Sequence, residues 1–131
     1  MARERVAGGG RMAAAAVVVS SREELDAAVR RADEGGKLLL VRFTADWCPL
    51  CVHAKTEVEA CQREFGAHAV TVDVGESTEL SEELEIGKLP RVFVYSRGAR
   101  VVDVVGRSEG AVTEACRKFV FASGVASEVD F

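Results

Sequence analysis

Apolar residues along this chain follow two alternating patterns. Short runs that are apolar almost throughout predict buried strands, whereas apolar residues spaced three and four apart predict helices that cover them. The predicted strands span residues 14–20, 37–43, 69–74, 91–95 and 100–105, and the predicted helices span 22–33, 48–65, 77–84 and 109–121. Strand–helix alternation that ends in a hairpin and a helix indicates an α/β fold, with a central mixed β-sheet flanked by helices.

Polar and glycine-rich segments mark the ends of these elements. Ser20 and Ser21 are followed by Glu24, which is a capping-box pattern at the start of the first helix. The turn at residues 96–99 contains Gly98 and predicts a hairpin. We therefore expect one domain over residues 13–122, a flexible N-terminal tail over 1–12 and a C-terminal tail over 123–131.

Composition and charge exclude several classes of protein. With 131 residues, the chain is long enough to bury a core without disulfide staples. A net charge of −4 gives no basic surface, so we expect no nucleic-acid partner. No apolar stretch approaches the ~18 residues of a membrane span, so we expect no membrane association. The chain is expected to be a monomer.

The N-terminal residues resemble a targeting segment only in part. Arg3, Arg5 and Arg11 precede an apolar run, as in a signal or mitochondrial transit segment. Glu4 departs from the acid-free composition of transit segments, and the valines at 17–19 are needed for a first strand. We expect a cytoplasmic protein, with the mitochondrion as the alternative.

The most informative motif is Trp47-Cys48-Pro49-Leu50-Cys51, directly after the second predicted strand. Residues i and i+3 on the first turn of a helix share a face, so the two sulfurs can form a disulfide. Unpaired N–H groups and the helix dipole favour a thiolate at Cys48. Pro49 fits the first helical position, where a missing N–H costs nothing. A thiolate is the nucleophile in disulfide exchange, so the pair predicts redox chemistry.

The other cysteines and the histidines do not complete a metal site. Zinc would require a second close ligand pair, and Cys61, Cys116, His53 and His68 form none. Cys61 and Cys116 are interpreted as small buried residues of amphipathic helices. A resolving or regulatory role for either one stays open.

Pro90 lies between a predicted helix and the strand at 91–95. Proline cannot donate to a strand ladder, so it belongs at a strand entry or a turn. We favour a cis Leu89–Pro90 bond, which would turn the N–H and carbonyl of Leu89 outward toward an extended substrate backbone. An ordinary trans proline at a strand start is the alternative.

From about residue 17 to residue 121, the chain resembles a thioredoxin. The resemblance is carried by Trp47-Cys48-x-x-Cys51, Val72-Asp73-Val74, Leu89-Pro90, Tyr95-Ser96-Arg97-Gly98 and Gly106, in the order and approximate spacing of that family. It implies a thioredoxin-like fold, a nucleophilic Cys48 and a resolving Cys51. It also implies a cis Pro90 beside the sulfurs and a Trp47 that covers the disulfide and forms part of the partner surface.

The chain departs from the family pattern around the motif. Pro49-Leu50 replaces the usual Gly-Pro, and Arg42 replaces a buried acid that helps to deprotonate the second cysteine. Ala69 stands where the family often has a lysine that pairs with that acid, and Arg91 follows Pro90 in place of the usual small threonine.

These departures change the expected electrostatics of the motif. A cation at Arg42 favours thiolates and tunes the pair toward a more oxidising potential, whereas Pro49 acts against this by removing an N–H donor. Lys88, Arg91 and Arg107 predict a locally positive groove.

These observations predict a thioredoxin-type protein-disulfide oxidoreductase. Cys48 would attack a client disulfide and Cys51 would resolve the mixed disulfide, with Trp47, Leu89, Pro90 and Arg91 contacting the client. Electrons would come from a reductase or a small dithiol, and no metal or organic cofactor is implied. The alternative is a thioredoxin-fold binding or adaptor module, or a redox-regulated chaperone, with little turnover.

Overall fold

The computed structural model describes residues 17–120 of the chain. Its elements are α1 (Arg22–Glu34), β1 (Leu39–Thr44), α2 (Cys51–Phe65), β2 (His68–Asp73), α3 (Thr78–Glu83), β3 (Arg91–Ser96), β4 (Ala99–Val105) and α4 (Ala111–Val120). The expected tails, 1–12 and 123–131, lie outside the described residues, as do the outer limits of the expected domain. No helix within residues 17–120 is long and apolar enough to span a membrane.

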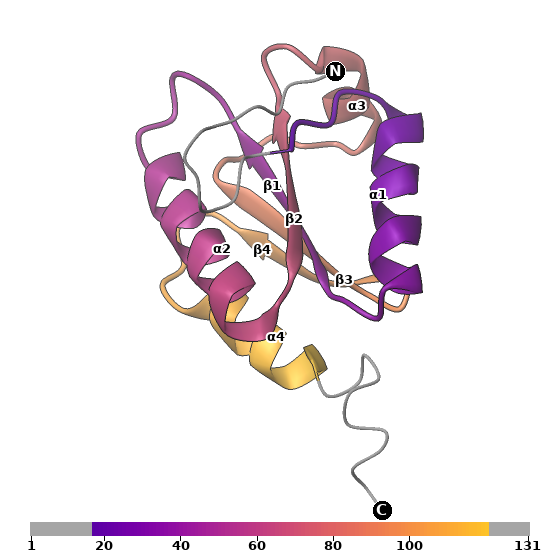
Figure 1. Ribbon diagram of the computed structural model, residues 1–131. Coiled ribbons are helices and arrows are strands. Elements are labelled where there is room, and N and C mark those ends of the chain that lie inside the picture. Colours follow the sequence, from indigo (N-terminus) through magenta and orange to yellow (C-terminus); the bar gives the residue numbers. More distant parts are fainter. Residues whose placement is uncertain (1–16, 121–131) are drawn as a thin grey trace, which may run out of the picture.

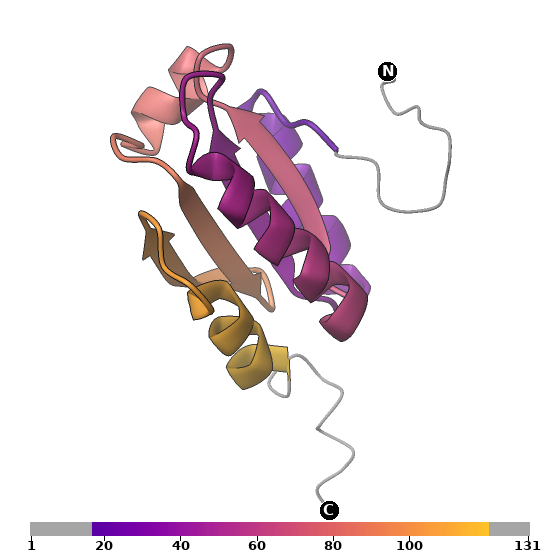
Figure 2. The same cartoon turned by 90° about the vertical axis from the view of Figure 1, so that its left-hand side faces the viewer.

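The four strands form one mixed sheet in the order β2-β1-β3-β4. β1 pairs in parallel with β2 and antiparallel with β3, and β3 continues antiparallel to β4. Helices α1 and α3 lie on one face of the sheet, and α2 and α4 lie on the other (Figures 1 and 2). The expected α/β architecture with a central mixed sheet is therefore confirmed.

Two apolar cores lie on the two faces of β1. Alternate residues of a strand point to opposite faces, so Leu39, Val41 and Phe43 pack toward α1, whereas Leu38 and Leu40 pack toward α2 and α4. Phe43 meets Phe93 of β3 edge to face, with ring centroids 4.8 Å apart. The inner strand is thus covered on both faces, as its continuous apolar run predicts.

The expected first strand is reduced to a single bridge within the described residues. Val18 pairs with Thr71 of β2, through hydrogen bonds from Val19 N to Thr71 O (2.9 Å) and from Thr71 N to Val17 O (2.8 Å). Ser21 then caps α1 by accepting a hydrogen bond from the Glu24 N–H. The chain therefore leaves the sheet edge almost at once, because the helix cap begins three residues after the bridge.

The second helix begins later than expected. The N–H groups of Cys51, Val52 and His53 donate to the carbonyls three residues earlier, at 3.2, 3.4 and 3.1 Å. This tight turn holds residues 48–50 before the regular helix, whose N-cap Leu50 has no side-chain acceptor. Cys48 and Pro49 consequently lie in the turn that leads into α2 and not on its first helical turn.

A partly exposed ion pair joins β3 to β4 on the α1 side of the sheet. Arg91 Nε and Nη2 donate to the two carboxylate oxygens of Asp103 at 2.9 and 2.6 Å. The pair is diagonal, since Arg91 lies opposite Val105 and Asp103 lies opposite Phe93. These hydrogen bonds hold the pKa of Asp103 below its ordinary value and raise the pKa of Arg91.

We predict that this pair makes part of the stability dependent on pH. Because the pKa of Asp103 is depressed in the folded state, its contribution is complete above the ordinary carboxyl pKa and is lost as the pH falls through the folded value. At pH 7, Asp103→Asn should lower the free energy of unfolding by about 1 kcal/mol, a figure reduced for the partial exposure of the carboxylate. Urea unfolding at pH 7 and at successively lower pH values measures the difference.

Glu109→Gln is the matched control, because Glu109 pairs with Arg107 at an exposed site. It should change stability little at any pH. If the difference in the free energy of unfolding between wild type and Asp103→Asn stayed constant down to pH 2, the Arg91–Asp103 pair would not be the source of the pH dependence.

Candidate functional site

Cys48 and Cys51 form a disulfide at the carboxyl end of β1, with their Cα atoms 5.5 Å apart. Cys48 is the fourth residue after β1, and a hydrogen bond from its N–H to Ala45 O (3.1 Å) closes the turn. Cys51 is buried, with 3% of its surface exposed, whereas Cys48 is half-buried. The first sulfur is therefore the accessible one of the pair.

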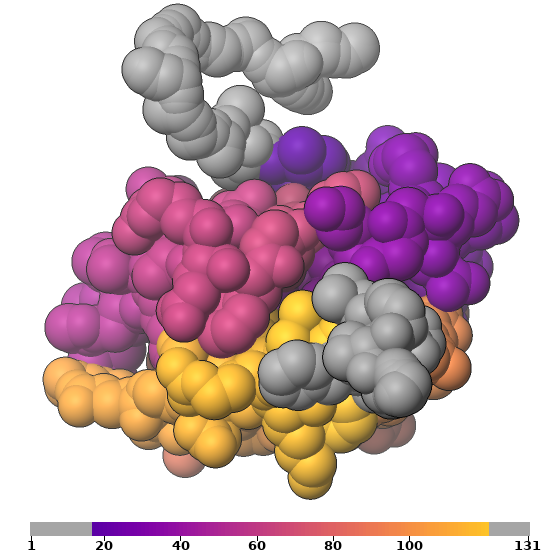
Figure 3. Space-filling model, turned by 60° about the horizontal axis from the view of Figure 1, so that its bottom comes forward, coloured from indigo at the N-terminus to yellow at the C-terminus, as the bar shows by residue number. Residues whose placement is uncertain are grey.

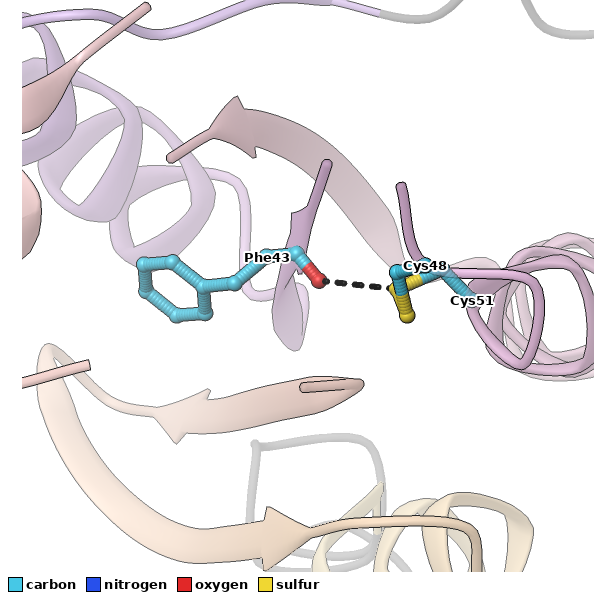
Figure 4. Close-up of a disulfide and its surroundings, with 3 residues drawn as sticks. All are labelled: Phe43, Cys48 and Cys51. Carbon is cyan, nitrogen blue, oxygen red and sulfur yellow. Dashed lines mark hydrogen bonds between the residues drawn. A yellow bond between two sulfur atoms is a disulfide. The ribbon is translucent and has the colours of Figure 1, made fainter. Parts of the chain in front are cut away.

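The backbone of β1 contacts the second sulfur directly. Sγ of Cys51 lies 4.0 Å from the carbonyl oxygen of Phe43 (Figure 4). In the reduced protein, the Cys51 thiol can donate a proton to this oxygen. A carbonyl oxygen accepts hydrogen bonds and donates none, so it can pair with the Cys51 thiol and not with the thiolate.

Exposed apolar side chains flank the two cysteines along the chain. Trp47 is 69% exposed, and Leu50 and Val52 are also exposed although they are large and apolar. Exposed apolar residues grouped beside a reactive atom are typical of a surface that docks another protein. The predicted place of Trp47 at the edge of the motif agrees with this arrangement.

The Leu89–Pro90 peptide bond is cis, as the sequence predicts. Pro90 is buried, and its carbonyl accepts a hydrogen bond from Gly106 N at 2.7 Å. Within residues 17–120, the backbone N–H and carbonyl of Leu89 have no hydrogen-bond partner. The residue before the proline thus offers one donor and one acceptor to an incoming chain.

The structure corrects the predicted role of Arg91. Its guanidinium is turned to the α1 side of the sheet, where Asp103 and the carbonyl oxygen of Glu85 accept its hydrogen bonds. Arg107 is likewise paired, with Glu109 at 2.8 Å. The predicted positive groove therefore loses two of its three cations to neighbouring carboxylates, and Lys88 remains as an exposed cation.

Arg42 lies inside the molecule on the α2 side of β1, the face that alternation predicts. It is 9% exposed, and its Nη2 donates to Thr71 Oγ1 at 3.4 Å. Burial lowers the pKa of Arg42, and the nearby carboxylate of Glu59 on α2 opposes this effect. Glu59 is therefore the carboxylate that compensates the buried guanidinium, whereas the carboxylate of Asp73 accepts hydrogen bonds from Gly75 N and Glu76 N.

The position beside Arg42 on β2 is Thr71 and not Ala69. The parallel register pairs Arg42 with Thr71 and Leu40 with Ala69. Ala69 lies two residues before Thr71 on the same face of β2, since a shift of two preserves the face of a strand. Side-chain patterning alone cannot tell which of the two lies beside Arg42.

A cavity of about 360 Å³ opens beside Pro90, between α2 and the loop that precedes α4. Its wall includes His53 and Glu57 from α2, Gly106 and Arg107 after β4, and Thr113 from α4. The carboxylate of Glu57 accepts hydrogen bonds from Thr113 N (2.9 Å) and Thr113 Oγ1 (2.8 Å). Glu57 thus caps α4 from a neighbouring helix.

The sequence analysis missed the Glu57–Thr113 and Arg91–Asp103 contacts. Both join elements that are distant in the chain, and only the packing of α2 on α4 or the register of the β3–β4 hairpin reveals them. His53 and His68 lie on the surface as expected, the first on α2 and the second at the start of β2. Among residues 17–120, no cluster of three His, Cys, Asp or Glu side chains could hold a metal ion.

Comparison with known proteins agrees with this geometry. The sequence model of the thioredoxin family, described as Thioredoxin, matches residues 16–118. An H-type thioredoxin of Oryza sativa subsp. indica is 30% identical over 106 residues, which cover 80% of this chain and 87% of the rice protein. Thioredoxin-2 of Saccharomyces cerevisiae is 29% identical over 93 residues, covering 70% and 86% of the two chains.

Among solved structures, a thioredoxin of Plasmodium falciparum superposes with a TM-score of 0.67 at 27% identity, over 79% of this chain and 98% of that one. The matched region contains the cysteine pair, the cis proline and the mixed sheet. The chain belongs to the thioredoxin family, and it is a thiol–disulfide oxidoreductase whose redox centre is the Cys48–Cys51 pair.

Proposed function

We propose that this protein reduces client disulfides with Cys48 as the nucleophile and Cys51 as the resolving thiol. The observation that carries the assignment is the unequal exposure of the two sulfurs, because only Cys48 is open to a second protein. The Cys48 thiolate attacks a client sulfur to form a mixed disulfide and expels the other client sulfur as a thiolate. Cys51 then attacks Cys48, which releases the reduced client and forms the intramolecular disulfide.

The client would approach as an extended chain across Leu89. The unpartnered N–H and carbonyl of that residue can pair with a client backbone, while Trp47 and Leu50 contact apolar side chains beside the client disulfide. Arg91 supports this surface from behind, because its bond to Asp103 fixes the strand that follows Pro90. A reductase or a small dithiol would return the pair to the dithiol state.

The compartment that we propose is the cytoplasm. Cys61 and Cys116 are free thiols, which persist in compartments kept reduced by glutathione and thioredoxin. The mitochondrion remains the alternative because of the arginines at 3, 5 and 11. Microscopy of the full chain with a C-terminal fluorescent fusion should show diffuse cytoplasmic signal in yeast, and overlap with a mitochondrial marker would contradict the proposal.

The roles of the two cysteines predict opposite results for two substitutions. Cys48→Ser should lower insulin-disulfide reduction to the rate of the small dithiol alone, because the attacking thiolate is removed. Cys51→Ser should accumulate mixed disulfides with insulin, because nothing resolves them. Non-reducing gels detect the adducts, and the turbidity of precipitating insulin chains measures turnover.

Cys61→Ser provides the matched cysteine substitution at a buried position away from the disulfide. It should retain turnover and should form no adduct. Adducts that form on Cys48→Ser would reverse the assigned order, and wild-type turnover no faster than the dithiol background would favour the adaptor alternative.

We propose that Arg42 tunes the pair toward a more oxidising potential. A buried cation favours thiolates over thiols and so stabilises the reduced state. The effect is moderated by Glu59, because its negative charge opposes the charge of the guanidinium. Glu59 lies on α2, eight residues, or about 12 Å of helix, beyond Cys51. Pro49 acts in the opposite direction, since it supplies no N–H donor beside Cys48.

Arg42→Asp should therefore raise the pKa of Cys48 by about one unit and lower the reduction potential by roughly 30 mV. Glu59→Gln should shift both quantities in the opposite direction, because it removes the carboxylate that opposes the guanidinium. Thiol titration at 240 nm and equilibration with glutathione buffers measure them. Unchanged values in both variants would mean that the Arg42 charge does not reach the sulfurs.

A further inference from the structure

Two cysteines outside the redox centre face each other across the interface of α2 and α4. Cys61 on α2 is 1% exposed, and Cys116 on α4 has no exposed surface. Each thiol shifts the pKa of the other, and both side chains belong to the core between these helices and the sheet. Figure 3 shows the yellow surface of α4 beside the magenta surface of α2.

A chain of polar groups leads from Cys61 to a carboxylate. Sγ of Cys61 lies 3.5 Å from Thr113 Oγ1, and that hydroxyl donates to Glu57 at 2.8 Å. A hydroxyl has one proton to give, so Thr113 accepts from the Cys61 thiol while it donates to Glu57. The Cys61 proton therefore has a route, through the hydroxyl, to a carboxylate on the same helix.

The two thiols have different proton affinities. The interaction with Cys116 lowers the pKa of Cys61, against the opposing effects of burial and of the Glu57 and Glu64 carboxylates. Burial and the interaction with Cys61 raise the pKa of Cys116. Cys61 is thus the member of the pair that loses its proton first.

The cavity beside Pro90 comes close to this pair, although neither cysteine is part of its wall. Thr113, Glu57 and Ala60 line its wall, and Cys61 lies directly behind the Thr113 hydroxyl. A small molecule in the cavity is therefore separated from Cys61 by one side chain. A cavity of about 360 Å³ admits a hydroperoxide and excludes a folded protein.

We propose that Cys61 and Cys116 form a second redox-active pair, oxidised to a disulfide by small hydroperoxides that enter this cavity. The Cys61 thiolate attacks the peroxide, so that an S–O bond forms, the O–O bond breaks, and the Cys61 proton leaves with the departing oxygen as water or an alcohol. Cys116 then attacks the Cys61 sulfenic acid, forming the S–S bond, and the hydroxide that is released takes the Cys116 proton as water. One peroxide is reduced by two electrons, and the two thiols are oxidised to one disulfide.

The disulfide would covalently link two helices that are distant in the chain, since Cys61 and Cys116 are 55 residues apart. It would also fix Thr113 and Glu57, which form the cavity wall opposite Pro90. Oxidation of the second pair therefore changes the groove beside the redox centre without consuming the Cys48–Cys51 pair.

The test uses the full chain with Cys48 and Cys51 already joined, so that two thiols remain. After treatment with hydrogen peroxide, titration in urea should find no thiol, the intact mass should fall by 2 Da, and peptide mapping should recover a Cys61–Cys116 linkage that dithiothreitol reverses. The double variant Cys48→Ser/Cys51→Ser, which lacks the oxidoreductase centre, should form the same linkage. Retention of both thiols, or mass gains of 16 or 32 Da without a linked peptide, would overturn the proposal.

Thr113→Val tests the route, because it removes the hydroxyl while it keeps the N–H that Glu57 accepts. Thiol loss should slow by about five-fold in this variant, since Cys61 loses its proton acceptor. If oxidation proceeded through unfolding instead, the variant would react as fast as wild type or faster, and the proposed cavity route would be wrong. Cys116→Ala supplies the resolving control and should stop at the sulfenic or sulfinic acid.

Discussion

The burial of β1 on both faces is the constraint on which the rest of this structure depends. It lies between β2 and β3 in the sheet, so that Leu39, Val41 and Phe43 enter one core and Leu40 enters the other. Its last residues fix the carbonyl of Phe43 beside Cys51 and set the point at which Cys48 leaves the sheet. The reactive turn can be short and exposed because the strand before it is held by packing and by ladders on both edges.

The same constraint makes Arg42 the most unusual residue of the chain. A guanidinium in a two-sided strand costs free energy unless polar groups compensate for the lost water. Compensation comes from Thr71, which the parallel register places beside it, and from Glu59, which α2 brings over the strand. Thioredoxins usually hold an acid at this position, whereas this chain holds a cation. The hydroxyl of Thr71 and the carboxylate of Glu59 compensate the cation's charge.

Most of the fold and the centre of the site could be predicted from the sequence, because they depend on local patterns. Strand runs, helix periodicity, the cysteine spacing and the proline at a strand entry are all properties of short segments. The errors concern relations between segments: the β1–β2 register that brings Thr71 to Arg42, the hairpin register that brings Asp103 to Arg91, and the packing of α2 on α4. The later start of α2 is a local error, and it arose because a tight turn before a helix has the same apolar spacing as the helix itself.

Helix α2 shows why cysteine chemistry cannot be inferred from residue type. It carries Cys51 at its first residue and Cys61 almost three turns later. The sulfur of Cys51 faces a backbone carbonyl, where the hydrogen-bonded chain ends, whereas that of Cys61 faces a hydroxyl that is itself hydrogen-bonded to the Glu57 carboxylate. Both cysteines are buried, so their difference lies in the proton partner of each sulfur and in what can reach it. For Cys51 the approach is through Cys48, and for Cys61 it is through the cavity wall. The packing of α2 against β1 and against α4 therefore gives its two cysteines, Cys51 and Cys61, different environments.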